Sequence, residues 1–447
     1  MNSPKARPIL WDIYEEHLSE AAWLWGNWEN ALDSAVYALG DVAVGPEERL
    51  LAHLDGLVLG GQPVAQKLLV PALTGDDLGG IAAAAWVLVQ AEDADHQDIV
   101  VEALASAEPP AQAAIGRALY LAPRADLSRL IPLFHTGAPL VRAMIFDVFG
   151  TREPDWVREH IDPAMRSGQP PLVAAAVRAI RNLRERALLD YVTIASQSDD
   201  IEVRLEAMRT GLSFAVKATW DECRIFAGGI GQMCRLPLGL LATSPDPNDR
   251  AFVRGKARNA DDAEVGMHAL WALGFAGDAD SADILVQAMA DEEKSRVAGE
   301  AFAAITGLVM AGELAKPGET QGPDVAEVAD EDPPPTVRPE DFLPEPRAEQ
   351  VKKWWDKERR RYVPGIRYAG GQPRSPATLR TALIGGACWR REVFLLELVA
   401  SVANLPRVIP PKVDLKGWAR EQLKQLEPSK AALPGVPRVE TVAWGRS

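Results

Sequence analysis

The sequence predicts an all-α protein, built as a solenoid of stacked helical hairpins. Apolar residues recur at helical spacing through most of the 447 residues. A pattern of small and large apolar residues also returns at intervals of roughly 30 residues between positions 80 and 315. The sustained alternation of apolar and polar residues that marks strands is scarce. These three observations together favour helical repeats over any sheet architecture.

Composition narrows the class of protein. Hydrophobic residues make up 47% of the chain and charged residues 25%, which is typical of ordered globular proteins. The net charge of −15 disfavours nucleic-acid binding, because such proteins neutralise phosphates with Lys and Arg. No apolar run reaches the length of a membrane span or a signal peptide, so we expect a cytoplasmic protein without membrane insertion. Three cysteines without metal-ligand spacing indicate reduced, inert thiols.

Residues 1–79 are predicted to form a helical N-terminal cap. In "EERLLAHLDGLVLGG", Leu50, Leu54 and Leu57 share one face of a helix that should end at Gly60 and Gly61. Residues 80–315 are predicted to form the repeat array.

The segment "ALWALGFAGDAD" at residues 269–280 is typical of the array. Its small residues Ala272 and Gly274 should allow close contact between neighbouring helices, while Leu and Trp fill the core. The pair Gly277 and Asp278 should end the helix, and Asp280 or Ser281 should cap the next one.

The chain changes character at residues 316–346, which are acidic and rich in Pro and are predicted to be a linker. Residues 347–447 are predicted to form a C-terminal helical module with a loose tail. Helices are expected within 347–362, twice within 375–402 and within 415–427, and Ser375 is the expected N-cap of the second.

The repeated hairpins resemble HEAT repeats of the type named after phycobilisome lyases. The flanking segments "LWDIYEEHLSEAAWLWGNWENAL", "EERLLAHLDGLVLGG" and "WWDKERRRYVPGIRYAGGQPRSPATLRTAL" resemble an uncharacterised proteobacterial HEAT-like family. Genes of that family often lie among accessory and effector genes of type VI secretion. The resemblance implies a role related to secretion and identifies no activity.

The sequence lacks the features of known enzymes that are built on HEAT-like repeats. No His is followed by Glu, as a di-iron hydroxylase of this fold would require. A DNA glycosylase of this fold needs a basic concave surface, whereas the repeat region mixes both charge signs within an acidic chain. A bilin lyase matches in the structural repeats alone. His53 and Asp55 lie two residues apart and face different ways on a helix, and Cys223 and Cys234 have no base nearby in sequence. We therefore expect no catalytic, cofactor or metal site.

Two groups of residues are candidates for binding a partner protein. Trp23, Trp25 and Trp28 crowd the N-terminal segment; not all can face one core stripe, so they either cap the first repeat or include an exposed anchor. The second group is basic and aromatic, and it either binds an acidic partner or pairs with acids such as Glu327, Asp330 and Glu331 of the same chain. It comprises Lys352, Lys353, Trp354, Trp355, Lys357, Arg359, Arg360 and Arg361.

The expected function is that of a protein-binding scaffold. The resemblance favours an adaptor or chaperone of type VI secretion that acts on a secreted effector or spike component. Two alternatives stay open, an immunity-type inhibitor that covers a toxin's active site and an enzyme with an unrecognised, diffuse site. The sequence leaves the oligomeric state and the binding face of the array undetermined.

Overall fold

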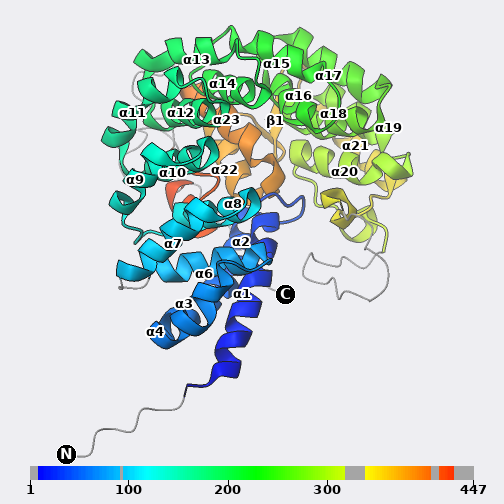
Figure 1. Cartoon of the computed structure of the whole chain (residues 1–447). Helices are drawn as coiled ribbons and strands as arrows, with labels where there is room; N and C mark the ends of the chain where they lie inside the picture. Colours follow the sequence, from blue (N-terminus) through cyan, green and yellow to red (C-terminus); the bar gives the residue numbers. More distant parts are fainter. Residues whose placement is uncertain (1–8, 91–93, 318–337, 404–411, 427–447) are drawn as a thin grey trace, which may run out of the picture.

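The computed structural model describes residues 9–90, 94–317, 338–403 and 412–426, and these residues are overwhelmingly helical. The predicted all-α solenoid is therefore confirmed. Figure 1 shows the helices arranged as a horseshoe in two rows, one lining the inside and one the outside. The strands found in the described part of the chain form one hairpin, β1 (Tyr368–Ala369) and β2 (Gln372–Pro373), which pair antiparallel.

Successive helices of the inner row pack on one another except between α14 and α16, and we call this row the wall. It consists of α1 (Trp11–Ala31), α6 (Leu78–Gln90), α8 (Pro109–Leu121), α10 (Pro139–Arg152), α12 (Pro170–Leu183), α14 (Ile201–Ser213), α16 (Arg235–Thr243), α18 (Ala263–Ala276) and α20 (Glu292–Thr306). The outer row consists of α3 (Pro46–Leu59), α7 (Ala94–Ser106), α9 (Ile131–Thr136), α11 (Pro154–Arg166), α13 (Leu189–Ala195), α15 (Thr219–Ala227), α17 (Pro247–Asn259), α19 (Ala279–Ala288) and α21 (Ala348–Glu358). Short helices α2 (Leu39–Val44), α4 (Gly61–Val64) and α5 (Val70–Ala72) join the first hairpins.

Local sequence signals set the helix ends. Gly277 takes the left-handed conformation with φ +72° and ends α18, as predicted. The next helix is capped by Asp278, whose carboxylate accepts the backbone N–H of Ser281. The expected cap at Asp280 or Ser281 is wrong, because the chain turns so tightly at Gly277 that the residue directly after it already occupies the capping position.

The wall is less regular at its middle, where the sequence shows a longer interval between repeats. Helices α14 and α16 are joined largely through α15 on the outside and α23 (Arg391–Val402) on the inside. At this point the array depends on residues from the far C-terminal end of the chain.

The C-terminal helices lie inside the horseshoe (Figure 1). We call α22 (Pro376–Gly385), the short helix η8 (Cys388–Arg390), α23 and α24 (Ala419–Leu426) the hub. Helix α23 packs on α14 and α16, and both α22 and α24 pack on α2. The predicted helices of this region are confirmed, as is Ser375 as the N-cap of α22. The concave surface that a solenoid usually offers to a partner is thus covered by the protein's own chain.

Gly274 has a different role from the expected one. A Cβ atom built there would lie 2.6 Å from Nη1 of Arg390, a hub residue, so the missing side chain makes room for this guanidinium group and not for a neighbouring wall helix. Small residues on α18 such as Ala269 and Ala272 are fully buried, as the packing prediction requires.

We predict that Gly274→Ala lowers the free energy of unfolding by about 1–3 kcal/mol, because the buried Arg390 must shift to accept the methyl group. The matched control is Gly255→Ala in α17, where a Cβ meets nothing within 4 Å. That change should stabilise the protein by about 0.5–1 kcal/mol through helix propensity. Thermal and urea unfolding of both variants test the pair, and equal effects would contradict this role for Gly274.

Candidate functional site

The inner surface of the wall carries a ladder of charges that passes from one repeat to the next. Arg178 on α12 donates two hydrogen bonds to Asp147 on α10, at 3.0 and 2.8 Å. On α14, Glu206 accepts from Arg181 at 3.2 Å and from Arg209 at 3.1 Å. Burial alone raises the pKa of Glu206, but the neighbouring guanidinium groups outweigh it and hold this pKa below its usual value. The ladder fixes the spacing of three consecutive repeats.

Arg209 continues the ladder into the hub. Its Nε lies 2.7 Å from Oε1 of Glu392 on α23, so the same side chain joins α14 to the C-terminal helices. Arg390, which is buried, makes a second connection by pairing with Glu300 on α20 and donating to the carbonyl of Trp271 on α18. Hub and wall are therefore joined by charge-assisted hydrogen bonds at several points.

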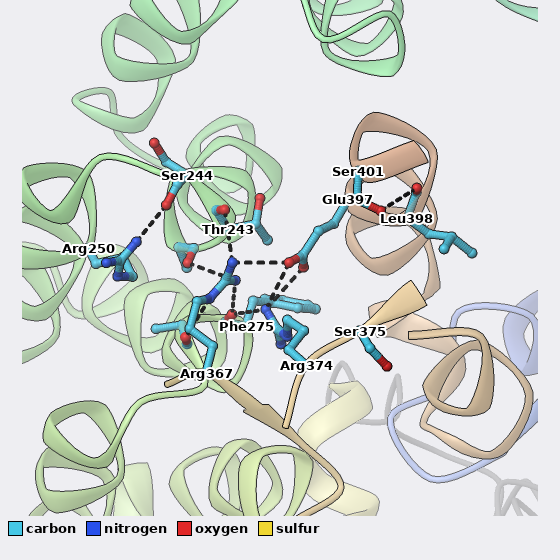
Figure 2. A network of polar contacts seen from close by, with 12 residues as sticks. Thr243, Ser244, Arg250, Phe275, Arg367, Arg374, Ser375, Glu397, Leu398 and Ser401 are labelled. Atoms are coloured by element: carbon cyan, nitrogen blue, oxygen red, sulfur yellow. Dashed lines mark hydrogen bonds and ion pairs between the residues drawn. The ribbon is translucent and has the colours of Figure 1, made fainter. Parts of the chain in front are cut away.

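A polar network anchors the β-hairpin to the ends of two wall helices (Figure 2). Arg367 donates to the carbonyls of Thr243 at the end of α16 and of Phe275 and Ala276 at the end of α18. These last-turn carbonyls lack partners within their helices and form the negative end of the helix dipole. A guanidinium group can satisfy several of them at once.

Glu397 of α23 completes this network. Its carboxylate lies 3.1 Å from Arg367 and 3.0 Å from Arg374, and Arg374 also donates to the carbonyl of Phe275. Burial lowers the pKa of Arg374 to about 10, which leaves the group cationic at neutral pH. The arrangement is an ion-pair anchor that holds the β-hairpin and α23 on the ends of α16 and α18.

The last described helix is held by an aromatic cluster near the N-terminal end of the array. The Trp418 ring lies 4.7 Å from that of Trp28 and 6.3 Å from that of Trp86, and its N–H donates to the carbonyl of Leu121. Glu47, which is fully buried, accepts hydrogen bonds from Trp28 and from the first backbone N–H groups of α24. Its carboxylate thus satisfies donors at the start of α24 that would otherwise be unpaired.

The structure separates the three N-terminal tryptophans. Trp25 and Trp28 are buried in the core with Trp418 and are therefore not accessible to a partner. Trp23 is 46% exposed and is the member of the trio that stays accessible.

The basic and aromatic group at α21 is largely engaged within the chain. Trp355 is buried and donates to Asp283 at 2.7 Å, and Arg359 pairs with the same carboxylate at 2.6 Å. At the surface, Lys352 pairs with Asp356 and Arg361 with Glu358, while Trp354 packs edge-on against Phe302. Lys353 and Arg360 are exposed. The acids expected as partners, Glu327, Asp330 and Glu331, lie outside the described residues.

Two histidine side chains contact another group that could take part in acid–base or nucleophilic catalysis. His17 and His53 lie with their Nδ1 atoms 3.0 Å apart between α1 and α3. Nδ1 of His268 lies 3.7 Å from Sγ of Cys234, a pair that sequence reasoning missed because 34 residues separate its members. Burial raises the pKa of Cys234 and lowers that of His268 to about 4. The pair is a neutral thiol beside a neutral imidazole, which is a poor nucleophile.

Two further features are absent from the described residues, a metal site and a membrane-spanning helix. No three His, Cys, Asp or Glu side chains come together in a way that could hold a metal ion. No described helix combines the length and the apolar character needed to cross a membrane.

In comparisons with known proteins, no family model, no curated protein and no solved structure matches this chain. Any assignment of function must therefore be argued from the residues and their geometry.

We predict that Glu397→Gln lowers the free energy of unfolding by about 3–5 kcal/mol, because it leaves Arg367 and Arg374 without their shared counter-charge. The matched control is Glu358→Gln, which removes a more exposed partner of Arg361 and should cost less than about 1 kcal/mol. Denaturant unfolding at neutral pH compares the two. Similar losses would show that the network in Figure 2 contributes no more than a surface ion pair.

His268 should make stability depend on pH. Its folded pKa of about 4 lies below the unfolded value near 6.5, so the unfolded chain binds the extra proton between these values. Stability should fall as pH falls from 6.5 to about 4, by up to about 3 kcal/mol from this group. His268→Gln should remove that part of the slope, while His135→Gln, at an exposed histidine, should leave it in place. An unchanged slope in His268→Gln would refute the assignment.

Proposed function

We propose that this protein is a scaffold that binds another protein, acting in the cytoplasm as an adaptor or chaperone of bacterial type VI secretion. Its partner in this proposal is a secreted effector or a spike component. The helical array supports a binding role, and the resemblance of the flanking segments to the HEAT-like family supports the secretion context.

Because the hub fills the concave surface, a partner protein would bind another face of the horseshoe. The hub covers the inner surface of the horseshoe with buried ion pairs and aromatic contacts, so a partner of protein size would have to displace much of the C-terminal chain to bind there. We therefore place the partner on a surface that is exposed in the closed horseshoe.

The observation that carries this proposal is an exposed apolar patch at the free end of α1. Ile9, Leu10 and Ile13 are exposed, and Figure 1 shows that this end of α1 projects beyond the horseshoe together with α3 and α4. We call residues 9–16 the N-terminal arm. Contiguous exposed apolar side chains with a polar rim are typical of protein-interaction sites.

Charge on the arm indicates the chemistry of the partner. Asp12, Glu15 and Glu16 are exposed beside the apolar patch, and the chain as a whole carries a net charge of −15. A partner surface with an apolar centre and basic residues around it would complement the arm and be steered toward it. Trp23, farther along α1, adds an exposed aromatic anchor for the same partner.

The proposal predicts that Ile13→Asp disrupts partner binding. Co-expression with the products of adjacent genes, followed by purification, should yield a stable complex, and the variant should weaken it at least tenfold, which corresponds to about 1.4 kcal/mol. The matched control is Ile225→Asp on α15, on a distant part of the horseshoe. Both isoleucines are exposed, at 46% and 60%, so each change should leave folding intact.

Cell-based readouts distinguish the adaptor from the immunity alternative. Deletion of an adaptor should abolish export of its cargo, whereas an inhibitor should protect cells from a co-expressed toxin without affecting export. A complex that survives Ile13→Asp, or one that Ile225→Asp disrupts equally, would contradict binding through the N-terminal arm.

A further inference from the structure

A cavity of about 350 Å³ lies between the wall and the hub. It is formed by the end of α1, the start of α16, the middle of α18 and the start of α23, and Leu415 also lines it. This volume is in the range of small-molecule sites. The cavity is separate from the N-terminal arm and from the network in Figure 2, and neither explains it.

Four buried hydrogen-bond donors around this cavity have no acceptor among the described residues. They are Nη2 of Arg235, Nε1 of Trp271, Nε1 of Trp389 and Nε of Arg391. Each unsatisfied buried donor costs on the order of 1–3 kcal/mol, and a charged one costs more. These four atoms are themselves sealed from the cavity, but together they mark its surroundings as rich in donors and poor in acceptors.

Arg391 is the clearest member of this set. It is 2% exposed, and its recorded contacts go to the amide oxygen of Gln422 and the sulfur of Cys388, both uncharged. A cation buried without a carboxylate partner is strongly destabilising unless something else neutralises it. An anion in the cavity would do so.

Arg235 can also bind an anion, because two indole rings fix the position of its guanidinium group. Its guanidinium carbon lies 4.7 Å from the centre of the Trp271 ring and 5.1 Å from that of Trp389, so two indoles hold the group from the wall and from the hub. A cation positioned in this way loses little further freedom when it binds a ligand.

The other charges around the cavity restrict the ligand. Two acidic side chains line it as well: Glu392, which is paired with Arg209, and Asp33, which interacts with Arg235. Arg391 is then the cation without a counter-charge among the described residues, and one such cation suits a singly charged anion better than a multiply charged one. Leu32, Leu236 and the two indoles add apolar surface, which favours a ligand with an apolar body.

We propose that this cavity binds a small monocarboxylic acid with an apolar body, that the guanidinium groups of Arg235 and Arg391 bind its carboxylate, and that the two indole rings contact its apolar part. The ligand lies between wall and hub, and it therefore stabilises the closed horseshoe by mass action. Cys388 lies beside it as a protonated thiol, since burial raises its pKa to about 11.

Calorimetric titration and thermal unfolding of the full chain test this proposal with four probes, which are benzoate, indole-3-acetate, benzamide and inorganic phosphate. At least one of the two carboxylates should bind with a one-to-one stoichiometry and raise the melting temperature. Benzamide, the uncharged analogue of benzoate, should bind at least tenfold more weakly than the carboxylates, and so should phosphate. Failure of both carboxylates to bind, or tighter binding of benzamide or phosphate, would overturn the proposal.

Variants locate the site. Arg235→Gln should weaken carboxylate binding at least tenfold, and so should Arg391→Gln, which removes the second cation that lines the cavity. The matched control is Arg152→Gln, at another partly buried arginine whose pKa burial also lowers and which lies outside the cavity. Unchanged binding in both cavity variants, or equal weakening in the control, would place the anion elsewhere and refute the site.

Discussion

The closed horseshoe depends on charge compensation between its wall and its hub. Two ion pairs join the hub to the wall directly, Arg390 with Glu300 and Arg209 with Glu392. A third, Arg367 with Glu397, lies within the C-terminal region and holds Arg367 against the ends of two wall helices. Taking such groups out of water is costly unless both partners are in place. Wall and hub are therefore parts of one packed unit, and the apolar contacts around Trp418 have the same consequence.

Much of the fold follows from local sequence, while the position of the hub does not. Helix periodicity, Ser375 as a cap and Gly277 as a terminator act over a few residues, and the structure confirms them. The contact between Arg117 and Lys416 spans 299 residues, and no periodic pattern indicates it. The neighbour of Gly274 is Arg390, which lies far along the chain. The sequence pattern around Gly274 therefore predicts a contact with a wall helix instead. Spacing likewise could not decide which of Trp23, Trp25 and Trp28 is exposed.

The candidate sites differ in how far the sequence could reveal them. The exposed residues of the N-terminal arm belong to one continuous stretch and are visible as a cluster, although their exposure is not. The cavity combines Arg235, Trp271 and Arg391 from three separated elements, so only the assembled fold brings its donors together. Helix α1 connects the two regions, because it carries Ile13 near its start and is followed directly by Asp33 at the cavity.

The contact of Glu47 with the first backbone N–H groups of α24 joins residues 372 positions apart. During synthesis on the ribosome, the early hairpins emerge long before their C-terminal cover exists. Their inner surface, with its carboxylates and indoles, is therefore exposed to water or bound by a chaperone until the last helices have been translated. Contacts of such high sequence separation form slowly, so closure of the ring should be the final folding event. A chain interrupted before residue 419 would leave that surface permanently open to proteases and to aggregation.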